Sequence, residues 1–105
     1  MNKRLEMLIQ MTSSGNADAF AWYALAMEYR KAEQSEQAME TFASLRSSFP
    51  DYLPQYLMAG QTAMEMGNAS AAVPWLTAGL ALAEKVGDDK TLSELSAALD
   101  EAKQE

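Results

Sequence analysis

The sequence predicts an all-α protein built from repeated pairs of helices, and three observations support this. Strong helix formers, namely alanine, leucine, methionine, glutamate and glutamine, dominate the composition, whereas valine occurs twice and isoleucine once. The hydrophobic fraction of 49% is enough to give a chain of 105 residues a folded core. Similar residues also recur 34 positions apart, and periods of this length are typical of stacked helical repeats.

The repeated pattern alternates large and small side chains. The first copy has the spacing Trp22-x-x-Leu25-Ala26-x-x-Tyr29, followed by Ala38, Phe42 and Pro50. Positions 34 residues further on hold Tyr56, Ala59, Gly60, Ala63, Ala72 and Leu76. Two helices pack closely where small residues of one face large residues of the other. We therefore predict that the repeat core consists of Trp22, Leu25, Ala26, Tyr29, Ala38, Phe42, Tyr56, Gly60, Ala72 and Leu76.

This pattern resembles the tetratricopeptide repeat (TPR), which runs Trp-x-x-Leu-Gly-x-x-Tyr, then Ala-x-x-x-Phe, then Pro, in 34 residues. Residues 19–52 match it closely, with Ala26 in place of the glycine, and residues 53–86 form a degenerate second copy. The resemblance implies a single domain over residues 1–105, of the kind found in small stand-alone bacterial TPR proteins. Its expected architecture is a short right-handed superhelix of antiparallel helix pairs, with capping helices at both ends.

The flanking residues bring the expected number of helices to about six. Residues 1–15 are spaced like the second helix of a half-repeat, since Leu8 lies 34 positions before Phe42. Residues 88–105 predict an amphipathic C-terminal capping helix, because their apolar residues share one face. The expected helices cover residues 3–12, 17–31, 36–48, 52–66, 69–86 and 90–103.

Local signals predict where several of these helices begin. We expect Asn16 or Asp18, Ser35 and Thr91 to act as N-caps, because their side chains can accept hydrogen bonds from free backbone N–H groups. Pro74 removes one backbone donor, so we expect it to delay the start of its helix or to bend it.

The TPR resemblance also implies a binding groove, lined by the first helix of each repeat. The residues of these helices that are not assigned to the core predict its lining: Phe20, Tyr23, Met27, Arg30 and Lys31 in the first repeat, and Leu57, Gln61 and Met64 in the second. The surface they form is apolar and aromatic with a basic end. It would suit a hydrophobic peptide or an amphipathic helix, with a carboxylate near the basic end.

The expected function is therefore that of an adaptor or scaffold that binds another polypeptide, whose identity the sequence leaves open. An alternative is a homo-oligomeric structural unit whose repeat surfaces meet one another. The terminal helices could also fill the groove themselves. We expect self-association in either case, because a short array has large apolar end faces.

Composition argues against other functions. The chain has no histidine and no cysteine, which removes the commonest general base, nucleophile and metal ligands, so we expect no enzymatic activity, cofactor or metal. A net charge of −7 disfavours nucleic acid and anionic membranes as partners. No apolar stretch is long enough to span a bilayer, and the N-terminus is a poor signal peptide, so we expect a cytoplasmic protein.

Overall fold

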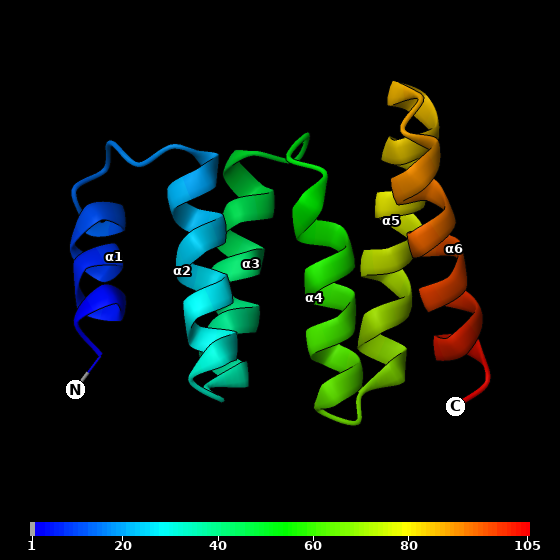
Figure 1. Ribbon diagram of the computed structural model, residues 1–105, viewed down its shortest axis with the longest axis horizontal. Coiled ribbons are helices and arrows are strands. Elements are labelled where there is room, and N and C mark those ends of the chain that lie inside the picture. The colour runs from blue at the N-terminus through cyan, green and yellow to red at the C-terminus, as the bar shows by residue number, and fades with distance from the viewer. Residues whose placement is uncertain (1) are drawn as a thin grey trace. The chain divides into compact units, whose positions relative to one another are not determined.

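A computed structural model describes residues 2–105, and these form six α-helices, which confirms the all-α prediction (Figure 1). The helices are α1 (Lys3–Ser13), α2 (Ala19–Lys31), α3 (Ser35–Ser48), α4 (Pro54–Glu65), α5 (Ala69–Val86) and α6 (Asp89–Lys103). They divide into two compact units, Met1–Tyr52 and Leu53–Glu105. The boundary between the units falls at the junction of the two sequence repeats.

The first unit is built around the pair of helices α2 and α3 (Figure 1). Ala26 of α2 and Ala38 of α3 are completely buried, and such small side chains allow two helices to pack closely. Phe42 is also completely buried and fills the core of the pair. Trp22 and Tyr29, which the sequence pattern placed in the core, are only partly buried.

Helix α1 packs against α2 through a small apolar cluster. Leu5 and Leu8 of α1 are buried against Leu25 of α2, and the partly buried rings of Trp22 and Tyr29 border the cluster. Trp22 and Tyr29 therefore serve the contact with α1. This explains their partial exposure, because a helix of 11 residues covers only part of their surface.

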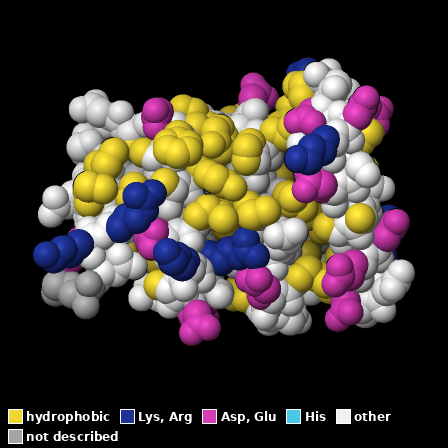
Figure 2. Space-filling view, viewed as in Figure 1, with side chains coloured by type: hydrophobic (Ala, Val, Ile, Leu, Met, Phe, Trp, Pro, Cys, Tyr) yellow, Lys and Arg dark blue, Asp and Glu magenta, His cyan; other side chains and the backbone are white. Residues whose placement is uncertain are grey.

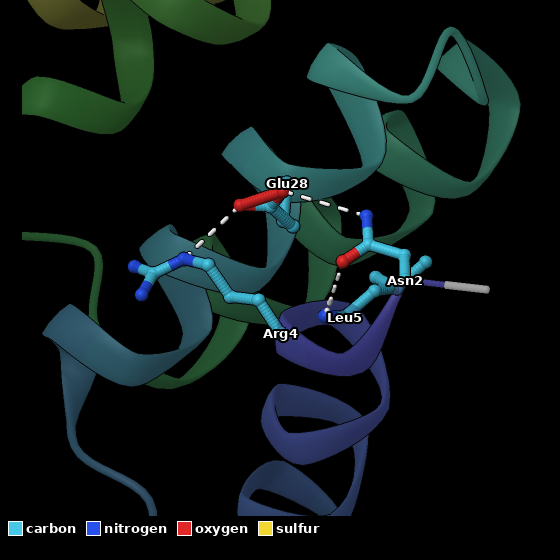
Figure 3. Close-up of polar contacts among 4 residues, drawn as sticks. All are labelled: Asn2, Arg4, Leu5 and Glu28. Carbon is cyan, nitrogen blue, oxygen red and sulfur yellow. Dashed lines mark hydrogen bonds and ion pairs between the residues drawn. The ribbon is translucent and has the colours of Figure 1, made fainter.

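Polar side chains fix the first turn of α1 to the last turns of α2 (Figure 3). The guanidinium Nε of Arg4 donates to Oε1 of Glu28 at 3.1 Å, and the amide of Asn2 donates to Oε2 of the same carboxylate at 3.5 Å. Asn2 also caps α1, since its Oδ1 accepts from the backbone N–H of Leu5 at 3.0 Å. One buried carboxylate of α2 is thereby satisfied by the beginning of α1.

The second unit consists of α4, α5 and α6, in which α5 packs against both of its neighbours. Gly60 of α4 lies beneath the buried side chain of Leu76, and a Cβ at residue 60 would overlap it. Gly79 of α5 allows an equally close approach to Tyr56. The ring of Trp75 lies 5.9 Å from that of Tyr56.

Of the N-caps predicted from the sequence in the first unit, that of α2 agrees with the structure and that of α3 does not. Asp18 caps α2, because its Oδ1 accepts from the backbone N–H of Ala21 at 2.9 Å. The prediction that Ser35 is an N-cap is wrong, since Ser35 is the first residue of α3 and Gln34 occupies the cap position.

In the second unit, the N-cap of α6 is Asp88 and not Thr91, so that prediction is also wrong. The carboxylate of Asp88 accepts from the backbone N–H of Thr91 at 3.0 Å and from its hydroxyl at 2.8 Å. Helix α5 begins at Ala69 and continues through Pro74, so the proline lies inside the helix and does not delay its start. Pro74 is exposed, so water can reach the backbone around it.

Candidate partner-binding site

The face of α2 that the sequence predicted for binding is apolar and accessible at its N-terminal end. Phe20 is 64% exposed, which is unusual for so large an apolar side chain. Tyr23 and Met27 follow at steps of three and four residues, so they share the face of Phe20 and are half-buried. Arg30 continues the same line, and Lys31 is exposed beside it at the C-terminal end.

Aromatic neighbours within the first unit hold the ring of Tyr23. Its centroid lies 5.3 Å from that of Tyr52 and 6.5 Å from that of Phe42, and both pairs are tilted. Such geometry is favourable for aromatic pairs. Tyr23 therefore presents a ring whose position is set before any ligand arrives.

Burial and neighbouring groups raise the pKa of the two tyrosine hydroxyls of this cluster. Burial is the main cause that raises the pKa of Tyr23, the nearby Tyr52 raises it further, and Arg30 partly opposes the shift. The pKa of Tyr52 is raised by burial and by the carboxylate of Asp18. An unperturbed tyrosine is already neutral at pH 7, so both hydroxyls can donate as well as accept a hydrogen bond there.

Tyr52 is a residue that the sequence reasoning did not assign to the site. It follows Pro50 in the segment after α3 and reaches Tyr23 because that segment returns across the start of α2. A shallow hollow of about 350 Å³ adjoins it, lined by Ala19, Ser48, Phe49, Pro50, Asp51 and Tyr52. The only signal in the sequence was an aromatic residue two positions after Pro50, the last residue of the repeat pattern.

Basic side chains gather where the C-terminal end of α2 meets the N-terminal end of α1. The contacts of Arg4 and Asn2 with Glu28 show that these two ends lie together. Lys3 and Arg4 begin α1, and Arg30 and Lys31 end α2. Figure 2 shows dark blue side chains gathered on this part of the molecule, next to a hydrophobic area. The first unit therefore has a locally basic end in a chain of net charge −7.

The remaining predicted groove residues belong to α4, in the second unit. Leu57, Gln61 and Met64 recur at steps of four and three residues, so they share one face of that helix, and all three are half-buried. This face of α4 is apolar with one amide. The predicted lining is thus divided between two units, with five residues on α2 and three on α4.

Within residues 2–105, no group of three or more acidic residues is arranged to hold a metal ion. No helix in this part of the chain is both long enough and apolar enough to cross a membrane. The surfaces of α2 and α4 instead offer aromatic rings, thioethers and a few charges, which suit contact with another polypeptide.

Comparisons with known proteins identify similar folds among solved structures. The tetratricopeptide repeat domain protein from Salinibacter ruber is 31% identical. The match to its solution NMR structure covers 83% of this chain and 88% of that one, with a TM-score of 0.77. The match to its crystal structure covers 82% of this chain and 97% of that one, with a TM-score of 0.76.

A protein from Bordetella parapertussis shares the fold at a TM-score of 0.82, with 24% identity over 99% of this chain and 90% of the other. A scan against protein-family models and a search of the curated proteins find no match.

Proposed function

The chain belongs to the tetratricopeptide-repeat family, whose fold serves protein–protein interaction, and from this premise we propose that it binds an apolar or amphipathic segment of a partner protein along α2. The observation that supports this most directly is the exposure of Phe20 beside the fixed ring of Tyr23. Aromatic side chains with few rotatable bonds gain contact area at low entropic cost, and they often dominate binding energy.

The chemistry of the face narrows the kind of segment that fits it. Met27 adds a flexible thioether that adapts to an irregular apolar ligand. Arg30 and Lys31 lie at the far end of the same helix, so an acidic residue of the partner would meet a cation there. We infer that the ligand is an apolar stretch that ends in, or is followed by, a carboxylate.

Phe20 provides the sharpest test because it is exposed and its replacement leaves the packing of the first unit intact. Tyr23 is less suitable for this test, because its ring contacts the buried Phe42 and a carboxylate at residue 23 would disturb the core. We would capture partners from a lysate of the native source with the wild type and with Phe20→Glu. The matched control is Val86→Glu, which alters a similarly exposed apolar residue at the end of α5.

The partner should be captured by the wild type and by Val86→Glu, and lost by Phe20→Glu. Titration with a synthetic segment of that partner should then show a loss of affinity of ~30-fold or more for Phe20→Glu, as expected for a central aromatic contact. A charge reversal, Lys31→Glu, should weaken binding and reduce its dependence on salt. Retention of the partner by Phe20→Glu with unchanged affinity would refute the assignment to α2.

The face of α4 is tested separately with Leu57→Ala and Met64→Ala. A loss of affinity in these variants would add α4 to the binding surface, and unchanged affinity would restrict it to α2. The mass of each variant by light scattering shows whether the captured partner is another protein or a second copy of this chain.

A further inference from the structure

Helix α1 exposes the face that the second helix of a repeat normally turns toward its first helix. Met7 and Met11 of α1 lie 34 positions before Thr41 and Leu45 of α3. In α3 these positions are 7% and 0% exposed, whereas Met7 and Met11 are 51% and 46% exposed. Both positions of α1 therefore hold a large apolar side chain that stays exposed, whereas the aligned residues of α3 are buried.

The second repeat shows what this face contacts. Residues Trp75 and Gly79 of α5 are the next members of the same series, 34 positions after Thr41 and Leu45. Both meet Tyr56 of α4, through a ring pair at 5.9 Å for Trp75 and a close backbone approach for Gly79. The face of α1 that holds Met7 and Met11 therefore corresponds to a surface that packs on the first helix of its own repeat.

Helix α6 has the complementary pattern of a first helix. Its spacing Leu92-x-x-Leu95-Ser96-x-x-Leu99 reproduces Trp22-x-x-Leu25-Ala26-x-x-Tyr29, with the small residue in the same place. This pattern in α6 lies two residues further along the chain than two 34-residue periods from Trp22 would place it. The preceding helix α5 has 18 residues, whereas α3 has 14. In α4 the equivalent small residue, Gly60, is covered by Leu76 of the following helix, whereas Ser96 is exposed.

A hollow lies where such a following helix would pack. It measures about 560 Å³ and is bordered by α5 and α6. Its floor includes Ser96 and the half-buried side chains of Leu80 and Leu92. Three carboxylates stand around it, namely Glu84, Asp89 and Asp100.

We propose that α1 of one copy seats in this hollow of a second copy, so that α6 and the incoming α1 together complete one repeat. Met7 and Met11 supply the apolar side chains that pack over Ser96 and Leu92. Methionine suits this role because its unbranched side chain adapts to an irregular groove.

Charge selects α1 as the occupant of the hollow. Residues 53–105 hold three lysines and eight acidic residues, so this unit is strongly acidic. The first turn of α1 holds two cations, Lys3 and Arg4, against one carboxylate, Glu6, so this end of the helix is net basic. Helices of one repeat run antiparallel, which brings the beginning of α1 to the Asp100 end of α6. The side chain of Arg4 is exposed, so it can contact the hollow of the second copy while it keeps its ion pair with Glu28 of its own copy.

The association would be heterologous, because two different surfaces meet. A copy that uses its α1 keeps its hollow open for another, so assembly continues as a chain or closes as a ring. The association uses surfaces other than the α2 face assigned to the partner protein. Each of the two proposals, self-association and partner binding, can therefore fail without affecting the other.

The experiment uses the full chain in two variants, each of which disables one surface. Met7→Glu with Met11→Glu places acidic groups on α1, where they would face the carboxylates of the hollow. Ser96→Arg fills the hollow and changes its charge. All three positions are exposed, so both variants should fold, which circular dichroism verifies. Gln37→Glu and Ser47→Arg, at exposed sites of α3, are the matched controls.

Light scattering should show a mass above 11.5 kDa for the wild type that rises with concentration up to ~1 mM, since one helix in one groove makes a small interface. Each disabled variant alone should remain at 11.5 kDa. An equimolar mixture of the two should form a dimer and no larger species, because one intact hollow and one intact α1 remain. Raised salt should weaken this association.

Three results would overturn the proposal. The first is a wild type that stays at monomer mass over the whole range. The second is association that survives in either disabled variant. The third is a mixture of the two variants that fails to dimerise, since that would show that the two surfaces do not bind each other.

Discussion

Gly60 of α4 lies directly beneath Leu76 of α5, so close that a Cβ at residue 60 would overlap the leucine side chain. Leu76 is completely buried and cannot swing away into solvent. The contact therefore fixes how closely α4 and α5 approach, and glycine is the residue that allows it. The equivalent position in the first repeat is Ala26, which is also completely buried.

We expect Gly60→Ala to destabilise the protein by ~1 kcal/mol, measured by chemical denaturation. Alanine favours the helix by up to ~1 kcal/mol over glycine, but overpacking of a tight core typically costs ~1–3 kcal/mol. The double variant Gly60→Ala with Leu76→Ala should lose less stability than the sum of the two single variants, because the overlap disappears. Thr77→Ala, at the exposed neighbouring position, should change stability little. Strict additivity of the two substitutions would refute the contact.

We expect Ala38→Leu to cost ~1–3 kcal/mol of stability, because Ala38 is completely buried and has no room for a larger side chain. Ala43→Leu is the matched control, since Ala43 is on the exposed side of the same helix and leucine is nearly as good a helix former as alanine. The measurement is the melting temperature of both variants. Equal melting temperatures would mean that Ala38 does not face α2.

The sequence could predict the close packing of the helix pairs because the signal is local and repeated. Small residues recur 34 positions apart at Ala38 and Ala72, and both are completely buried. The repeat pattern did not place Trp75 and Gly79 in the core. The period aligns Trp75 with Thr41 and Gly79 with Leu45, so the small residue and the large residue have exchanged places between the two repeats. The volume lost at Gly79 is filled by the approach of Tyr56, which only the three-dimensional packing reveals.

The binding face was predictable from helix periodicity, whereas its aromatic support was not. Phe20, Tyr23 and Met27 share a face because of their spacing. The contact of Tyr23 with Tyr52 depends on the path of the chain after α3, which no local pattern encodes. The cap of α6 was misplaced for a related reason. Both Asp88 and Thr91 are residues that can cap a helix, and in the structure the cap is Asp88, which directly follows the left-handed Gly87 at the end of α5.

Glu28→Ala should loosen α1 from α2. It removes the carboxylate that accepts from Arg4 and Asn2, and we expect a loss of ~1 kcal/mol, since one side of this pair is exposed. Hydrogen exchange should show faster exchange for the amides of α1 than in the wild type, while those of α3 change little. Glu36→Ala, an exposed residue of α3, is the control. Unchanged protection of α1 would mean that its docking depends on Leu5 and Leu8 alone.

Asp88→Asn should make the stability of α6 less dependent on acid pH. The pKa of Asp88 is lowered mainly by the hydrogen bond from the backbone N–H of Thr91 and next by that from its hydroxyl. Desolvation opposes this shift in part, and Lys90 adds a smaller lowering of the pKa. Because the folded pKa lies below the unfolded value of ~3.9, the charged carboxylate stabilises the fold above that pH, and this contribution is lost as pH falls through the folded pKa. Asparagine can still cap the helix but does not titrate in this range.

The melting temperature of Asp88→Asn should therefore lie below that of the wild type at pH 7, and the difference should close as the pH falls below ~4. Asp88→Ala, which lacks any side-chain acceptor, should remain less stable than the wild type at every pH, because even a protonated aspartate can accept a hydrogen bond. The measurement is a series of thermal melts of the three proteins from pH 7 down to acid. A constant gap between wild type and Asp88→Asn throughout the series would show that the charge of Asp88 contributes nothing to the cap.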